Sequence, residues 1–146
     1  MRTKEFMARL DHGRIVAAIK GAEGQTSGEI RIYVQHGEME DDPLVVAGQK
    51  FVEFGMEKTR ARNAILILVA PRAQKFAVVG DEGIHQKCGE EFWEKLIATM
   101  RAHFQREAFT DALVEAIGNA GNLLATHFPR QPDDRNELPD IVVESP

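Results

Sequence analysis

Oxygen-bearing side chains stand at the ends of three predicted strands. Glu29 and Asn63 stand at the beginnings of the first two strands, and Asp81 and Glu82 directly follow the third. The third strand is predicted to run antiparallel to the others, so its end lies at the edge where they begin. Three carboxylates and an amide oxygen form a donor set that suits a hard cation such as Ca²⁺ or Mg²⁺. We therefore predict a divalent-cation site at which the oxygens of these four residues converge.

The same residues also have a purely structural interpretation. Glu29 can be an outward-facing strand residue, and Asp81 and Glu82 can be turn and helix-start residues, where acids are common. His85 follows closely and could serve this edge as an acid or base, although a structural role is the simpler reading. The acids alone therefore do not distinguish a cation site from ordinary turn chemistry.

A second acidic segment, predicted at the opposite edge of the sheet, is an alternative cation site. Ligands of open parallel sheets usually bind there, beyond the carboxyl ends of the strands. We favour the Asp81 edge, because Asp42 is explained as a helix cap and its neighbours are typical of a solvated charged run. This segment contains His36, Glu38, Glu40, Asp41 and Asp42.

The strands that would position these residues follow from hydrophobic periodicity. Apolar residues alternate with polar ones over about 28–36, which predicts a strand with one buried face. Residues 64–70 contain no polar side chain, so a strand over about 63–70 must be covered on both faces. A short turn leads into a third strand over 75–80. The first two strands, joined through a helix, should be parallel with a right-handed crossover, and the hairpin makes the third antiparallel.

Helices are predicted on both faces of this sheet. Asp11 caps a helix that runs to Glu23, and Asp42 with Pro43 starts a second helix that ends near Gly55. Two longer helices follow residue 89, so the order is αβαββαα and the fold is an α/β mixed sheet sandwiched by helices. The second helix should bury Leu44, Ala47, Phe51 and Phe54, and the later helices should largely bury Trp93, Phe104 and Phe109.

Size and charge exclude several classes of function. The chain has 146 residues, enough for one compact domain, and a formal net charge of -5, which disfavours nucleic acid as a partner. Its apolar runs are too short for a signal peptide or a membrane helix, so we expect a cytoplasmic protein without a membrane partner. The single cysteine, Cys88, excludes an internal disulfide and a thiolate-rich zinc site.

The familiar catalytic loops are also missing. A thiol phosphatase needs an arginine that closes its phosphate loop, but Glu94 stands six residues beyond Cys88. The sequence has no Gly-x-Ser-x-Gly elbow and no glycine-rich phosphate loop, so no nucleotide cofactor is expected. Phosphate hydrolysis by this chain would therefore depend on a metal ion.

The chain changes character after residue 128. We divide it into an α/β domain over 1–128 and a polar, proline-rich tail over 129–146 that should be extended and partly disordered. Leu138 and residues 141–143 are apolar among acids. They could recruit an unknown protein partner or a second copy of the chain, or pack back on their own domain; the remaining alternative is an integral strand over 141–143.

Five motifs together resemble the TPM domain family over roughly residues 11–128. They are Glu23-Gly24-Gln25-Thr26-Ser27-Gly28-Glu29-Ile30-Arg31-Ile32, Arg62-Asn63-Ala64-Ile65-Leu66-Ile67-Leu68-Val69, Lys75-Phe76-Ala77-Val78-Val79-Gly80-Asp81-Glu82-Gly83-Ile84, Trp93-Glu94-Lys95-Leu96 and Phe109-Thr110-Asp111-Ala112-Leu113. Ala64 and Ala112 depart from the family pattern, which usually has glycine at both positions.

The resemblance implies a limited range of functions. Similar domains include a thylakoid-lumen protein of photosystem repair with acid phosphatase activity, and others bind divalent cations. The expected function is thus a TPM-like domain that binds Ca²⁺ or Mg²⁺ and has weak metal-dependent phosphatase activity. The alternative is a non-catalytic protein-interaction module. Many members carry a signal peptide and a membrane anchor. Neither pattern is recognised in this sequence, so the chain resembles a free-standing cytoplasmic branch of the family.

Overall fold

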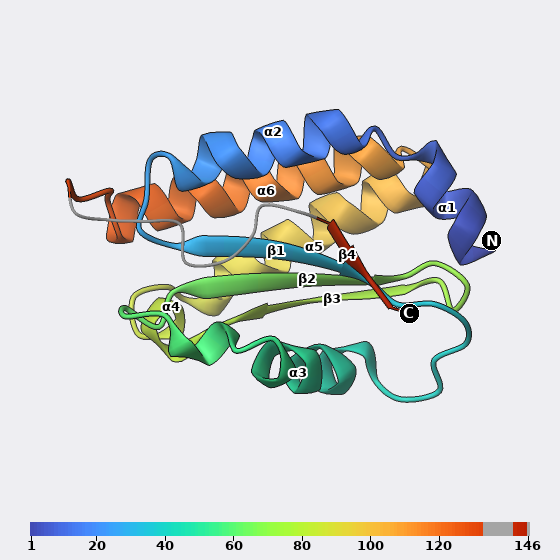
Figure 1. The fold of residues 1–146 in the computed structure, drawn as a ribbon, viewed down its shortest axis with the longest axis horizontal. Coiled ribbons are helices and arrows are strands. Elements are labelled where there is room, and N and C mark those ends of the chain that lie inside the picture. Colours follow the sequence, from blue (N-terminus) through green and yellow to red (C-terminus); the bar gives the residue numbers. More distant parts are fainter. Residues whose placement is uncertain (133–141, 146) are drawn as a thin grey trace.

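The computed structural model describes residues 1–132 and 142–145, which form a mixed sheet with helices on both faces (Figure 1). Helices α2, α5 and α6 cover one face, and α3 covers the other. The predicted α/β sandwich is therefore confirmed. The elements are α1 (Thr3–Arg9), α2 (His12–Glu23), β1 (Glu29–Val34), α3 (Pro43–Glu53), the 3-10 helix η1 (Met56–Lys58), β2 (Ala64–Ala70), β3 (Lys75–Gly80), α4 (Glu82–His85), α5 (Glu90–Gln105), α6 (Phe109–His127) and β4 (Val142–Glu144).

The sheet has the strand order β3-β2-β1-β4. Strands β1 and β2 are parallel and β3 is antiparallel to β2, as predicted. Strand β4 was not among the three predicted strands. It pairs in parallel with the end of β1, where Ile32 lies opposite Val142.

Strand β4 places part of the tail within the sheet. Among the alternatives for this segment, the structure shows an integral strand at Val142–Glu144. His36 anchors it, because its ring Nε2 lies 2.6 Å from the Glu144 carboxylate and its backbone N–H donates to the Ser145 hydroxyl. The predicted partner-recruiting residues Leu138 and Ile141 lie outside the described residues.

Strand β1 is buried on both faces, whereas the alternation predicted one. Ile30, Ile32 and Val34 pack in the core beneath α2 and α6. Tyr33 points the other way and packs in the second core, with Phe51 of α3. The alternation therefore reflects two different cores, and on the polar-looking side Tyr33 and Arg31 pack against the ring of Phe54, which follows α3.

The predicted caps of α2 and α3 are present. The Asp11 carboxylate accepts a hydrogen bond from the backbone N–H of Arg14, and Asp42 accepts one from Leu44 at 2.8 Å. The predicted burial of Leu44 is wrong, since it is 57% exposed. It shares an i, i+4, i+8 row with Gly48 and Val52, and this row faces away from the sheet.

Trp93, Phe104 and Phe109 are partly buried, where the sequence predicted that they would be largely buried. Trp93 covers Gly80, so closely that a Cβ atom there would lie 2.5 Å from the ring. Phe104 and Phe109 line a pocket, which keeps part of each ring accessible. Within the described residues, none of the helices combines the length and hydrophobicity that crossing a bilayer requires.

Candidate cation site

The strand register brings the predicted residues to one edge of the sheet. Glu29 lies opposite Ala64 in the parallel pair of β1 and β2. The backbone N–H of Asp81 donates to the carbonyl of Ala64 at 3.0 Å, which places the end of β3 on the other side of β2. The predicted common edge of Glu29, Asn63 and Asp81 is therefore correct at the level of the backbone.

Asp81 is the most constrained acid of this edge. Its side chain is 6% exposed, and its two carboxylate oxygens accept hydrogen bonds from Arg62 Nε at 2.7 Å and Nη2 at 2.9 Å. The same carboxylate caps α4 by accepting the backbone N–H of Glu82 at 2.8 Å. A bidentate pair of this kind fixes both the position and the orientation of the carboxylate.

Glu82 contacts the same guanidinium group from the solvent side. Its Oε1 lies 3.2 Å from Arg62 Nη1, and its side chain is 61% exposed. The side-chain hydrogen bond with Asp81 is the main cause that raises the pKa of Arg62 above its ordinary value, and the Glu82 charge adds to it. Two carboxylates from adjacent residues thus converge on one positive charge.

The backbone at Arg62 adopts an uncommon conformation that places its side chain beside Asp81. Arg62 has φ 53, in the left-handed region that residues other than glycine seldom adopt. Its carbonyl accepts a hydrogen bond from the N–H of Gly83 at 2.9 Å. A Cβ atom on Gly83 would lie 2.3 Å from the carbonyl oxygen of Ala61, so only glycine permits this approach. The turn before β2 and the start of α4 are therefore locked together.

The other two predicted ligands have different surroundings. The Asn63 amide nitrogen donates to the Ser27 hydroxyl at 3.1 Å, and the residue is 1% exposed. Glu29 is also 1% exposed and interacts electrostatically with Arg31. Burial lowers the pKa of Arg31, while Glu29 and Glu23 raise it in partial compensation. Over residues 1–132 and 142–145, no three His, Cys, Asp or Glu side chains form a ready-made metal cluster.

Arg62 and Glu23 are the residues that the sequence reasoning missed at this edge. Arg62 directly precedes Asn63 in the second motif, but its spacing alone does not indicate that its side chain pairs with Asp81. The buried Glu23 carboxylate accepts the backbone N–H of Ile30 at 2.7 Å. Strand β4 pairs with β1 only from Ile32 onward, so it offers no hydrogen-bond partner to Ile30. The Glu23 carboxylate supplies that partner for the backbone N–H of Ile30.

The competing acidic segment at the opposite edge has structural partners. Glu38 lies 3.7 Å from Arg72, His36 holds β4, and Asp42 caps α3. His85 packs against Trp93 with ring centroids 5.3 Å apart, which favours its structural reading.

Comparison with known proteins places the chain in a family. The model of the TPM domain matches residues 2–123. No curated protein matches the chain. The solution structure of BA42 from the psychrophilic bacterium Bizionia argentinensis is 34% identical, covers 92% of each chain and has a TM-score of 0.85. The N-terminal domain of cg2496 from Corynebacterium glutamicum shares the fold at 15% identity, over 77% of this chain and 70% of that one, with a TM-score of 0.57. The chain belongs to the TPM domain family.

Proposed function

We propose that this TPM domain binds one divalent cation, Ca²⁺ or Mg²⁺, at the Asp81–Glu82 edge in competition with Arg62. The observation that carries the proposal is the convergence of both carboxylates on one guanidinium group. Two adjacent negative charges focus a potential that favours any cation at this point. The carboxylate oxygens are also the donors that hard cations prefer.

The exposures of the three side chains suit an exchange of cations. Asp81 is held in place by the N–H of Glu82, whereas the Arg62 side chain is 40% exposed and can swing outward without unfolding the turn. Glu82, at 61% exposure, can turn toward an incoming ion from solvent. Asp81 and Glu82 would thus hold the ion, with water completing its shell.

The released Arg62 would give the edge a second function. A guanidinium group binds phosphate oxygens bidentately, so Arg62 can orient a phosphate monoester beside the acids. A bound cation would supply Lewis-acid polarisation of the phosphoryl group. We infer that weak phosphatase activity of this domain depends on the cation and on Arg62.

Calorimetric titration with Ca²⁺ and Mg²⁺ tests the competition. Asp81→Asn keeps a helix cap but removes the buried charge, so it should abolish binding. Arg62→Gln should tighten binding, because the internal competitor is gone. Glu91→Gln is the matched control, since this carboxylate is 80% exposed and contacts Lys95 elsewhere. Unchanged binding in Asp81→Asn, or weaker binding in Arg62→Gln, would show that the cation does not compete for this site.

Hydrolysis of p-nitrophenyl phosphate tests the catalytic part separately. Activity should appear with Ca²⁺ or Mg²⁺, vanish with a chelator, and be lost in both Asp81→Asn and Arg62→Gln. Cation binding without hydrolysis in the unmodified protein would retain the binding proposal and reject the phosphatase.

The exposed side of α3 favours a second candidate, a non-catalytic interaction module. Leu44, Val45 and Val52 are 57%, 55% and 62% exposed, and nothing lies within 4 Å of a Cβ placed on Gly48 between them. A row of apolar side chains on one helix face is typical of protein contacts. Sedimentation of the unmodified chain and of Val52→Lys should differ if this face joins two copies.

A further inference from the structure

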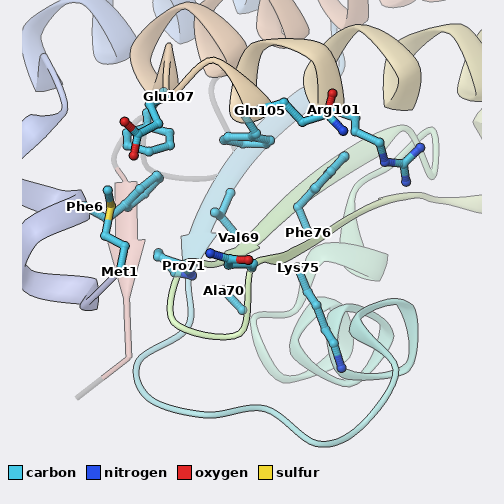
Figure 2. A pocket seen from close by; sticks show the side chains of 13 residues that line it. Met1, Phe6, Val69, Ala70, Pro71, Lys75, Phe76, Arg101, Gln105 and Glu107 are labelled. Carbon is cyan, nitrogen blue, oxygen red and sulfur yellow. The ribbon is translucent and has the colours of Figure 1, made fainter.

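A pocket lies at the edge of the sheet opposite Asp81, between the β2–β3 hairpin, α1 and the turn that joins α5 to α6 (Figure 2). Its volume is about 550 Å³, within the range of sites for small organic molecules. Ala70 and Pro71, at the carboxyl end of β2, form part of its wall. Ligands of open α/β sheets commonly bind at this end of the strands.

The apolar wall of this pocket is aromatic. Phe6 and Phe109 have ring centroids 5.0 Å apart, Phe109 and Phe104 are 6.3 Å apart, and Phe104 and Phe76 are 5.1 Å apart. Phe6 is 1% exposed and supports the ring of Phe109 from below, so the accessible aromatic surface is formed by Phe76, Phe104 and Phe109 of β3, α5 and α6. Such a surface suits a flat aromatic molecule, which can stack on rings at an offset or meet them edge to face.

The charges around the rings favour an anion over a cation. Arg101 lies over the Phe76 ring at 5.7 Å and Arg9 over the Phe109 ring at 4.7 Å, so one face of each of these rings already carries a guanidinium group of the chain itself. The acid of the pocket, Glu107, lies 3.6 Å from Arg9, which balances its charge. Arg101 forms no ion pair with any described residue. Lys75 also lines the pocket, but its ammonium group donates to the carbonyl of Met39 at 3.5 Å and points away from the rings (Figure 2), so Arg101 is the cation available to an anion there.

Two turns hold the rim of the pocket in uncommon backbone conformations. Gln74 has φ 54 and Glu107 has φ 58, so two of the three non-glycine residues with positive φ in the described part of the chain line this pocket. Backbone strain of this kind tends to gather at functional sites. Arg101 and Gln105 both come from α5, on the same side of the pocket (Figure 2).

We propose that this pocket binds a small aromatic anion, of the class of aromatic carboxylates. The ring system would pack on Phe76, Phe104 and Phe109, and the carboxylate would accept hydrogen bonds from the Arg101 guanidinium group. This site is separate from the cation edge, and the two proposals stand or fall independently.

The test compares two probes that share one ring system, 2-naphthoate and 2-naphthalenemethanol. Amide chemical shifts are followed by NMR during titration of the full chain with each probe. The naphthoate should move the amide signals of Gln74, Lys75 and Gln105 in a saturable way. It should bind about tenfold or more tighter than the neutral alcohol, the factor that one charge-assisted hydrogen bond supplies.

Arg101→Gln should weaken naphthoate binding by about tenfold and leave binding of the alcohol unchanged. Arg72→Gln is the matched control. Arg72 is an exposed arginine of the β2–β3 hairpin, and its side chain does not line the pocket. Its naphthoate affinity should equal that of the unmodified protein. Equal affinity for the two probes, equal losses in both variants, or shifts confined to another surface would each overturn the proposal.

Discussion

Gly80→Ala should destabilise the domain through a single, identifiable clash. A Cβ atom at this position would lie 2.5 Å from Cη2 and 2.8 Å from Cζ2 of Trp93, whereas carbon atoms pack at about 3.5–4.0 Å. The ring must therefore move by about 1 Å and loosen its contacts with His85 and Phe92, whose centroids lie 5.3 Å and 5.1 Å away. Overpacking of this kind costs about 1–3 kcal/mol. For a domain of this size the cost corresponds to a lower melting temperature by roughly 3–12 °C.

The tryptophan itself reports the displacement, because the chain contains one. Urea unfolding followed by fluorescence gives the free energy of unfolding, and the emission maximum of the folded state should shift to the red as the ring gains water. Gly118→Ala is the matched control: its Cβ meets nothing within 4 Å on the exposed side of α6, so the same methyl group should stabilise the helix by up to about 1 kcal/mol.

A double-mutant cycle isolates the contact between residues 80 and 93. Trp93→Phe removes the two ring atoms that clash, so Gly80→Ala should cost at least about 1 kcal/mol less in that background. Equal costs of Gly80→Ala in both backgrounds, or equal stability of the two alanine variants, would refute the packing argument.

Four further outcomes are expected. Arg62→Gln should lower the midpoint of urea unfolding, because it leaves the Asp81 carboxylate, which is 6% exposed, without its cation; the 40% exposure of the Arg62 side chain makes this loss smaller than that of a fully buried pair. Gln74→Gly should raise thermal stability by about 0.5–1 kcal/mol by relieving a left-handed backbone. Deletion of residues 133–146 removes β4 and should lower the melting temperature while circular dichroism keeps its helical signature. Burial raises the pKa of the Cys88 thiol, so less thiolate forms at pH 8 and its reaction with Ellman's reagent should be slower than that of free cysteine and should speed up as the pH rises.

The sequence predicts the elements whose residues repeat a strong local pattern. Strand β2 has no polar side chain between Ala64 and Ala70, and the structure buries all of it on both faces. The two capping aspartates, Asp11 and Asp42, sit where the predicted helices begin. These features depend on neighbours in the chain, which is why periodicity and capping rules find them.

Features that depend on distant pairing were harder to predict. Strand β4 has three residues, too few to show an alternating pattern, and its strand character comes from pairing with Ile32–Val34 more than a hundred positions earlier. Leu44 has the spacing of a core residue, but the direction in which α3 packs decides its exposure. The same holds for Phe104 and Phe109, whose apolar stripe meets a pocket instead of a closed core.

The candidate site shows the same division between local and distant information. Strand directions correctly bring Asp81 and Glu29 to one edge, because direction follows from the connections between the strands. The partner of Asp81 depends on the left-handed backbone of Arg62, which no spacing rule predicts. Within the described chain, the three non-glycine residues with positive φ are Arg62, Gln74 and Glu107.

All three left-handed residues lie at one of the two sites proposed above. Each such conformation costs of order 1 kcal/mol and persists only where other contacts enforce it. At Arg62 these contacts are the hydrogen bond from Gly83 and the bidentate pair with Asp81. Strained turns therefore stand at both ends of the sheet: Arg62 presents a guanidinium group at one end, and Gln74 and Glu107 present an amide and a carboxylate at the other. That coincidence is the physical reason to look for a cation at one edge and an aromatic anion at the other.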